Sequence, residues 1–123
     1  MKIMIVDDND LMRKEIIRSV TIKEDEVFEC SSGESAVKKC VEFFPDWILM
    51  DIRMPGMNGI SAAENIKKLL PDAHIAFITS YDNISYRQKA AMMGIECYFL
   101  KSDLLSIRKT LESYNILMRH DNV

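Results

Sequence analysis

Five short apolar segments alternate with longer amphipathic segments along this chain, and this alternation is the feature that most constrains its fold. The apolar segments are predicted strands at about 2–6, 26–30, 47–50, 74–78 and 96–100. After each one, apolar residues recur at three- and four-residue spacing, which is typical of helices that cover a sheet. Five repeats of strand and helix predict a parallel sheet with helices on both faces, because parallel strands need crossover connections.

Polar residues and prolines set the predicted limits of the helices. Candidate N-terminal caps precede four of the helical patterns: Asn9 or Asp10, Ser32-Gly33, Asn58 or Gly59, and Ser102 or Asp103. The second and third helices should end before Pro45 and Pro71, because the residue preceding a proline disfavours the helical conformation. Gly94 suits the left-handed C-terminal cap of a fourth helix at about 84–93. The last helix should carry an apolar face of Leu104, Ile107, Leu111, Tyr114 and Met118.

These elements predict a single domain over residues 1–123 with a doubly wound α/β fold. Right-handed crossovers restrict the topology, and we expect the flavodoxin-like strand order 2-1-3-4-5. The segment at 26–30 has the weakest strand pattern and should lie at an edge. In such sheets ligands bind outside the carboxyl ends of the strands, at the switch point between the first and third strands.

Polar residues directly follow four of the predicted strands. Asp7-Asp8 follow the first, Asp51 the third, Thr79 the fourth and Lys101 the fifth. Because the carboxyl ends of parallel strands share one edge, these residues should gather in one crevice. Two carboxylates about 4 Å apart repel by roughly 4 kcal/mol at an effective dielectric constant of about 20. Such a cluster needs a shared proton or counter-ions. Lys101 supplies one positive charge, and Mg²⁺ suits the remaining oxygens.

This set of side chains suits phosphoryl transfer. Asp51 is the natural nucleophile, since a carboxylate can form an acyl phosphate. Thr79 can donate a hydrogen bond to one phosphoryl oxygen, Lys101 can pair with another, and a bound cation would neutralise the incoming group. Taken singly, each residue also has an ordinary structural explanation, such as a helix cap for Thr79 or a turn former for Asp8. Their joint occurrence at successive strand ends favours the functional interpretation.

The composition excludes several other classes of protein. With 48% apolar and 28% charged residues, the chain is typical of a globular domain. The net charge of −3, with both signs mixed along the chain, argues against direct nucleic-acid binding. No segment approaches the roughly 20 apolar residues of a membrane span. The first apolar run meets two acids after Val6, which is unlike a signal peptide.

The cysteines and histidines lack the spacing of a metal site. Cys30, Cys40 and Cys97 are odd in number, so they are predicted to be buried and reduced, as in the cytoplasm. His74 and His120 have no ligand set nearby, and we expect no zinc site.

The residues at the strand ends resemble those of the response-regulator receiver domains of bacterial two-component signalling. The matching segments are 3–8 (IMIVDD), 51–59 (DIRMPGMNG), 79–80 (TS) and 98–101 (YFLK). The resemblance covers the whole chain. It implies a cytoplasmic signalling switch that catalyses only its own phosphorylation and dephosphorylation. Such a switch is not an enzyme with a separate substrate.

The resemblance also implies roles for the acidic residues. Asp51 would accept the phosphoryl group from a phosphohistidine of a sensor histidine kinase or phosphotransfer protein. Asp8 and Asp51 would bind Mg²⁺ directly, together with the backbone carbonyl of Arg53. Asp7 would act mainly through water.

In receivers of this kind the signal leaves through a change of packing. The resemblance implies that Thr79 and Lys101 hold the phosphoryl oxygens, that the Thr79 hydroxyl moves toward the phosphate, and that Tyr98 then turns inward. The surface of the fourth helix, fifth strand and fifth helix would carry the change to a second copy in a homodimer. It could equally carry it to an output or DNA-binding domain in transcription regulation.

The residue after Lys101 departs from the common pattern. Many receivers have proline there, whereas this chain has Ser102. The bond between the two residues is therefore either trans, or cis at a cost of about 3 kcal/mol. The segment 94–101 and this serine resemble receivers attached to nitrate-response-type helix-turn-helix transcription factors. No DNA-binding helix pair follows the last predicted helix, so the chain is expected to be a stand-alone or excised receiver without an output domain.

Arg53 and Tyr81 stand two residues after Asp51 and Thr79. Their side chains should flank the path of water toward a phosphoryl group on Asp51. Because both are bulky, they are predicted to lengthen the lifetime of the phosphorylated form.

Three other functions fit parts of the pattern. A haloacid-dehalogenase-type phosphatase would need a second aspartate two residues after the first, where Arg53 stands. A flavodoxin would need a phosphate-binding loop rich in hydroxyl and amide groups after the first strand, where Asp7 and Asp8 would repel the phosphate. The third alternative is a receiver-like interaction module that is never phosphorylated.

Overall fold

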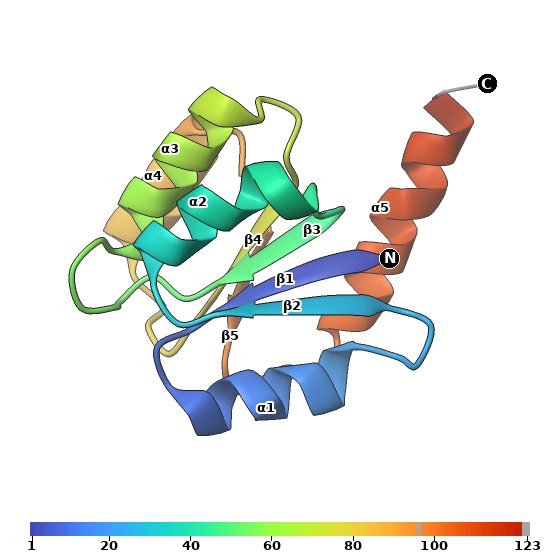
Figure 1. Cartoon of the computed structure of the whole chain (residues 1–123), viewed down its shortest axis with the longest axis horizontal. Coiled ribbons are helices and arrows are strands. Elements are labelled where there is room, and N and C mark those ends of the chain that lie inside the picture. The colour runs from blue at the N-terminus through green and yellow to red at the C-terminus, as the bar shows by residue number, and fades with distance from the viewer. Residues whose placement is uncertain (96, 122–123) are drawn as a thin grey trace.

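A single parallel sheet of five strands forms the centre of the molecule (Figure 1). The computed structural model describes residues 1–95 and 97–121, with side chains described up to residue 115. The strands are β1 (Lys2–Val6), β2 (Glu26–Cys30), β3 (Trp47–Met50), β4 (Ile75–Thr79) and β5 (Cys97–Leu100). Their order is β2-β1-β3-β4-β5, so the predicted flavodoxin-like α/β fold is confirmed.

Five helices cover the two faces of this sheet. They are α1 (Asp10–Val20), α2 (Gly33–Phe43), α3 (Gly59–Leu69), α4 (Ile84–Met92) and α5 (Ile107–Asp121). Figure 1 shows α1 and α5 on one face and α2, α3 and α4 on the other. None of the described helices has the length and apolar character needed to cross a membrane.

Two apolar layers hold the helices to the sheet. On one face Ile16 of α1 and Ile107 of α5 pack with Leu49 of β3, and on the other Ile66 of α3 packs with Ile48 of the same strand. Nearly every residue of β1, β3 and β4 is buried, because helices cover both sides of these central strands. The strand β2 is less buried and lies at an edge, as predicted.

Side-chain caps begin the first four helices. The caps Asn9, Ser32 and Asn58 were predicted, and each side chain accepts a hydrogen bond from a backbone N–H of the first helical turn at 2.9–3.1 Å. Asn83 caps α4 in the same way at 3.0 Å, which the sequence patterns did not indicate. Both proline-limited helices end before their prolines, and Gly94 adopts the predicted left-handed conformation, with φ of 75°.

The start of α5 differs from the prediction. The helix begins at Ile107, and the preceding residues form turns. The predicted cap by Ser102 or Asp103 is therefore wrong. The Asp103 carboxylate instead accepts a hydrogen bond from the Ser106 hydroxyl at 3.1 Å. Leu104, which precedes the helix, is also buried. The apolar periodicity therefore starts before the helix does, and the predicted helix began too early in the chain.

Smaller differences concern the ends of other elements. The strand β4 is shifted by one residue, so Thr79 is its last residue, and α4 ends one residue earlier than predicted, at Met92. Glu96, predicted to begin the fifth strand, lies outside the described residues. The side chains of Met118 and His120 lie outside them as well.

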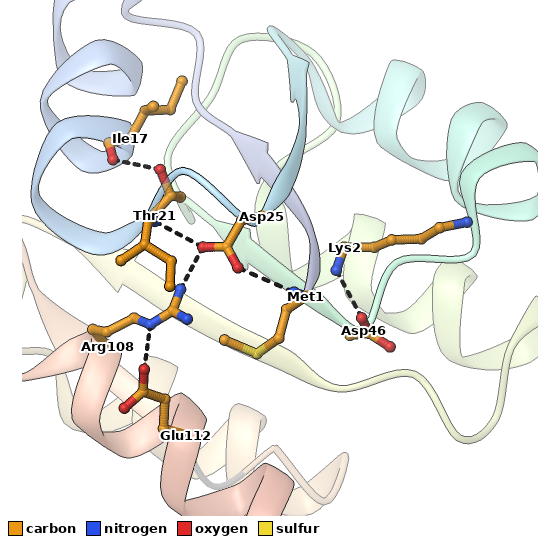
Figure 2. Close-up of polar contacts among 9 residues, drawn as sticks. Met1, Lys2, Ile17, Thr21, Asp25, Asp46, Arg108 and Glu112 are labelled. Carbon is orange, nitrogen blue, oxygen red and sulfur yellow. Dashed lines mark hydrogen bonds and ion pairs between the residues drawn. The ribbon is translucent and has the colours of Figure 1, made fainter.

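A cluster of charges around the buried side chain of Asp25 fastens α5 to the end of the sheet where β1 begins (Figure 2). The Asp25 side chain is 1% exposed and accepts a hydrogen bond from the Met1 α-amino group at 3.0 Å. It also forms an ion pair with Arg108 and accepts from the Ile22 backbone N–H at 2.8 Å, while Arg108 donates to Glu112 at 2.8 Å. Burial alone would raise the pKa of Asp25, but these hydrogen bonds and positive charges outweigh burial and lower it.

Candidate functional site

Asp7, Asp8 and Asp51 meet at the carboxyl ends of the neighbouring strands β1 and β3. One carboxylate oxygen of each residue lies within 4.8 Å of the others. Asp7 and Asp51 are buried, whereas Asp8 is exposed. The pairing of β1 with β3 sets this arrangement, since the Asp51 backbone N–H donates to the Val6 carbonyl at 2.9 Å. The structure thus places three acids, two of them buried, at the switch point of the sheet.

The ammonium group of Lys101 lies between the two buried carboxylates. Its Nζ is 2.9 Å from Asp7 Oδ2 and 3.0 Å from Asp51 Oδ2. Burial alone would lower the pKa of Lys101, but the contacts with Asp7 and Asp51 outweigh burial and raise it. Burial is also the largest influence on Asp51, and it raises the pKa of this carboxyl despite the nearby ammonium. One lysine is therefore too little positive charge for the buried acids.

Backbone pairing places Lys101 at this point without a cis peptide bond. No peptide bond between described residues is cis, so the Lys101–Ser102 bond is trans, one of the two alternatives that the sequence allows. The Lys101 backbone N–H donates to the Thr79 carbonyl at 2.8 Å, which continues the pairing of β4 with β5. The lysine side chain can therefore reach the acids from a regular strand end.

Thr79 is fully buried at the end of β4. Its hydroxyl oxygen accepts a hydrogen bond from the Tyr81 backbone N–H at 3.3 Å. Asp51 follows the adjacent strand β3, and its Oδ1 accepts from the Ile52 backbone N–H at 2.8 Å. The hydroxyl and the carboxylate thus stand at the same edge of two neighbouring strands, each fixed by its own loop.

Tyr98 of β5 is half-buried and is fastened to the loop between β4 and α4. Its hydroxyl donates to the Tyr81 carbonyl at 2.6 Å, and its ring meets Phe77 edge to face with the ring centres 6.5 Å apart. The guanidinium carbon of Arg87 lies 4.4 Å from the centre of the Tyr98 ring. Burial is the main cause of the raised pKa of Tyr98. The ring is therefore held by the loop that begins next to Thr79.

Arg53 and Tyr81, which sequence spacing places on either side of the acids, touch each other. The Arg53 guanidinium carbon lies 3.8 Å from the centre of the Tyr81 ring, and both residues are exposed. The Arg53 Nε also donates to the Tyr86 hydroxyl at 3.1 Å.

The acids provide the oxygen donors that a hard divalent cation prefers. The buried Asp7 Oδ2 is met only by the Lys101 ammonium among the described residues, and this ammonium is shared with Asp51. Two buried carboxylates that share one lysine leave negative charge that a cation can balance. The residues present therefore fit a magnesium ion.

A family model described as the response regulator receiver domain matches residues 3–112. The chain belongs to the response regulator receiver family. Receivers of this family act in two-component signalling, so the resemblance seen in the sequence is confirmed.

Curated relatives and solved structures agree with this membership. The response regulator VraR of Staphylococcus saprophyticus is 37% identical over 94% of this chain, and VraR of Staphylococcus epidermidis is 34% identical. The chain spans 58% of the length of each of these relatives. A LuxR-family response regulator from Aurantimonas shares 28% identity and a TM-score of 0.84 over 92% of this chain and 83% of its own. A two-component transcriptional regulator from Clostridium phytofermentans shares 29% identity and a TM-score of 0.81 over 100% and 99%.

Two residues position the acids of this receiver domain in a way that sequence reasoning missed. A Cβ atom on Gly59 would lie 2.0 Å from the Asp51 carbonyl oxygen, so α3 can start this close to the strand end only with glycine. Arg13 of α1 donates to the Asp7 carbonyl at 2.7 Å and steadies the loop after β1. The Asn-Gly pair that begins α3 could have indicated the glycine, but no sequence pattern indicates Arg13.

Proposed function

We propose that this receiver domain is a switch in which Asp51 accepts a phosphoryl group from a sensor histidine kinase or a phosphotransfer protein. The observation that carries the proposal is the position of Lys101 between two buried carboxylates, with a third carboxylate beside them. The surplus negative charge can hold a divalent cation, and this cation together with the fixed lysine would give the oxygens of an incoming phosphoryl group the positive partners that they need.

In the reaction, a carboxylate oxygen of Asp51 attacks the phosphorus atom of a phosphohistidine. The phosphorus–nitrogen bond breaks, and its electrons stay with the imidazole of the donor. Asp7, Asp8, Asp51 and the Arg53 carbonyl would hold Mg²⁺, which supplies charge neutralisation at the phosphoryl oxygens when bound. The receiver catalyses only this transfer and the later loss of its own phosphate.

Lys101 and Thr79 would hold the phosphoryl oxygens once the group is on Asp51. Lys101 Nζ already contacts the Asp51 carboxylate at 3.0 Å, so it can move from that oxygen to a phosphoryl oxygen with little displacement. The Thr79 hydroxyl would turn to donate to the phosphoryl group and give up its contact with the Tyr81 N–H. Thr79 would thus exchange a neutral partner for a charged one, and Lys101 would exchange one anionic oxygen for another.

Tyr98 would relay this change to the surface. Its hydroxyl is bonded to the same residue, Tyr81, whose N–H the Thr79 hydroxyl would leave, so the loop can release the ring inward. The altered surface of α4, β5 and α5 would then act on a second copy of the chain or on an output domain. A DNA-binding output domain is the preferred candidate, because the solved relatives include LuxR-family and transcriptional regulators.

We place residues 1–123 in one receiver domain, acting in the cytoplasm. The buried Cys30, Cys40 and Cys97 form no disulfide, which suits a reducing compartment.

Acetyl phosphate tests the central step. Wild-type protein incubated with acetyl phosphate and Mg²⁺ should gain the mass of one phosphoryl group in intact mass spectrometry, and Asp51→Asn should gain none. No gain in the wild type would favour the alternative of an interaction module that is never phosphorylated. Rapid turnover of many phosphoesters would favour a phosphatase.

The lifetime of the phosphorylated form tests the role of Arg53 and Tyr81. Their side chains stack on each other and belong to the loops that follow Asp51 and Thr79, so they would restrict the approach of water. Replacing both by alanine should speed phosphate loss several-fold, measured by the decay of the phosphorylated mass. An unchanged decay rate would show that neither side chain limits hydrolysis.

A further inference from the structure

Arg53 connects the loop after β3 to the first turn of α4. Its guanidinium stacks on the Tyr81 ring, with 3.8 Å from its carbon to the ring centre, and its Nε donates to the Tyr86 hydroxyl at 3.1 Å. Within residues 1–95 and 97–115, no carboxylate forms an ion pair with Arg53. Its positive charge is matched only by aromatic rings and a neutral hydroxyl, and these are weaker partners than an anion.

The helix that Arg53 touches has few other attachments. Of the nine residues of α4, only Ala90 is buried, and the half-buried Tyr86 packs against the same apolar layer. All other residues of the helix are exposed. Tyr86 also contributes the backbone N–H that Asn83 caps at 3.0 Å. A contact with the Tyr86 hydroxyl therefore acts on one of the two α4 side chains that pack in the apolar layer, and the Arg87 contact with the Tyr98 ring is a further attachment of this helix.

Arg53 and Tyr81 stand close in sequence to two residues of the phosphoryl site. Arg53 follows Asp51 by two residues, and Tyr81 follows Thr79 by two residues. Because β3 and β4 are neighbours in the sheet, the contact of Arg53 with Tyr81 joins the two loops that follow Asp51 and Thr79. A phosphoryl group on Asp51 would place about −1.5 to −2 charges at the start of these loops.

We propose that Arg53 is a latch that holds α4 in the unphosphorylated receiver and that moves to the phosphoryl group when Asp51 is loaded. This inference rests on the proposed function of Asp51. The guanidinium exchanges the Tyr86 hydroxyl for anionic oxygens, and the first turn of α4 loses one of its attachments. The latch acts beside the Thr79–Tyr98 relay and depends on a different pair of residues.

The latch predicts opposite effects for two substitutions. Tyr86→Phe removes only the hydroxyl that holds Arg53 in the unloaded state. Loading should become easier, with about threefold tighter binding of beryllium fluoride in the presence of Mg²⁺. Arg53→Gln removes the partner of the phosphoryl oxygens as well, and should weaken binding about tenfold. Isothermal titration calorimetry of the whole chain measures both changes.

A second measurement reports on α4 itself. Hydrogen exchange of the amides of residues 84–92 should be faster in unloaded Tyr86→Phe than in the unloaded wild type. Loading should then increase the exchange rate less in the variant than in the wild type. Tyr114→Phe is the matched control, because it makes the same chemical change on α5, across the sheet. It should leave both affinity and exchange as in the wild type.

The outcomes separate the latch from the proposed function. Loading of the wild type but not of Asp51→Asn supports the phosphoryl site, whatever the other variants do. Given that result, unchanged affinity and unchanged exchange in Tyr86→Phe would overturn the latch. Equal tightening by Tyr86→Phe and Arg53→Gln would also overturn it, since Arg53 would then have no attraction to the phosphoryl site. A wild type that binds no beryllium fluoride would overturn both proposals.

Discussion

Two buried aspartates, Asp25 and Asp51, lie toward opposite ends of the sheet and have opposite electrostatic environments. Asp25 is met by the Met1 α-amino group, Arg108 and a backbone N–H, and its pKa is lowered (Figure 2). Asp51 shares a single lysine with Asp7, and burial raises its pKa. A buried acid surrounded by donors is a structural anchor, whereas one that lacks positive charge has room for a cation and an anionic group to bind together.

The two environments should differ in their effect on folding. The ionised form of Asp25 is favoured in the folded state, so its charge stabilises the fold. The ionised form of Asp51 is disfavoured there, so its charge destabilises the fold until a ligand binds. The receiver would thus retain strain at its site that its anchor at the other end does not have.

Removing the charge of Asp25 should give the largest effect. Asp25→Asn leaves Met1 and Arg108 without their common anion in a buried place, and we expect a loss of about 3 kcal/mol in the free energy of unfolding. Urea denaturation measures it. Asp46→Asn is the matched control, since among the described residues the Asp46 carboxylate accepts only from the exposed Lys2 backbone N–H. If Asp25→Asn loses no more stability than that control, Asp25 is not a structural anchor and does not differ from Asp51 in this respect.

Magnesium should stabilise the site and leave the anchor unaffected. At ten times its dissociation constant, a ligand that binds only the folded state adds about 1.4 kcal/mol. We expect this gain, and its reversal by chelator, in the wild type and in Asp25→Asn. Asp51→Asn should gain clearly less, because it lacks one of the three carboxylates. Thermal melts with Mg²⁺ and with chelator give the comparison, and an equal gain in all three proteins would count against a magnesium site at Asp51.

The site around Asp51 could be predicted from the sequence, whereas the cluster around Asp25 could not. Apolar runs and their lengths determine the strands, and a parallel sheet brings strand ends together, so Asp7, Asp8, Asp51 and Lys101 could be assigned to one place. The anchor could not be predicted, because Asp25 and Arg108 are 83 residues apart and neither belongs to a periodic pattern. Asp25 stands between two glutamates, which suggests an exposed turn.

Contacts between side chains of the loops could not be predicted from the sequence either. Spacing placed Arg53 and Tyr81 on either side of the site, but their stacking and the bond to the Tyr86 hydroxyl depend on side-chain rotamers. The start of α5 was mistaken for a related reason. The turns before Ile107 bury Leu104 just as a helix would, so apolar periodicity alone cannot separate the two conformations.

Neutralising Asp51 should have a smaller effect, with the opposite sign to that at Asp25. In chelator, Asp51→Asn relieves the repulsion with Asp7 while Lys101 keeps one partner, and we expect a gain of about 1 kcal/mol in stability. For a domain of this size that corresponds to a melting temperature higher by about 3–5 °C. Differential scanning calorimetry measures it. A lower melting temperature in chelator, with the response to magnesium intact, would refute the idea of surplus negative charge.

The pH dependence of stability should distinguish the two aspartates by sign. The lowered pKa of Asp25 in the folded state means that its contribution is present above the unfolded value of about 3.9 and is lost as pH falls through the folded pKa. Asp51 behaves in the opposite way. Its raised folded pKa means that the folded state holds the proton more tightly, so stability falls as pH rises through the interval above about 3.9.

The stability that Asp25→Asn loses relative to the wild type should therefore shrink on acidification. The stability that Asp51→Asn gains should disappear over the same change of pH. Urea denaturation in chelator, from about pH 3 to pH 7, gives both differences. Differences from the wild type that vary with pH in the same direction for both variants would mean that the two acids are electrostatically alike.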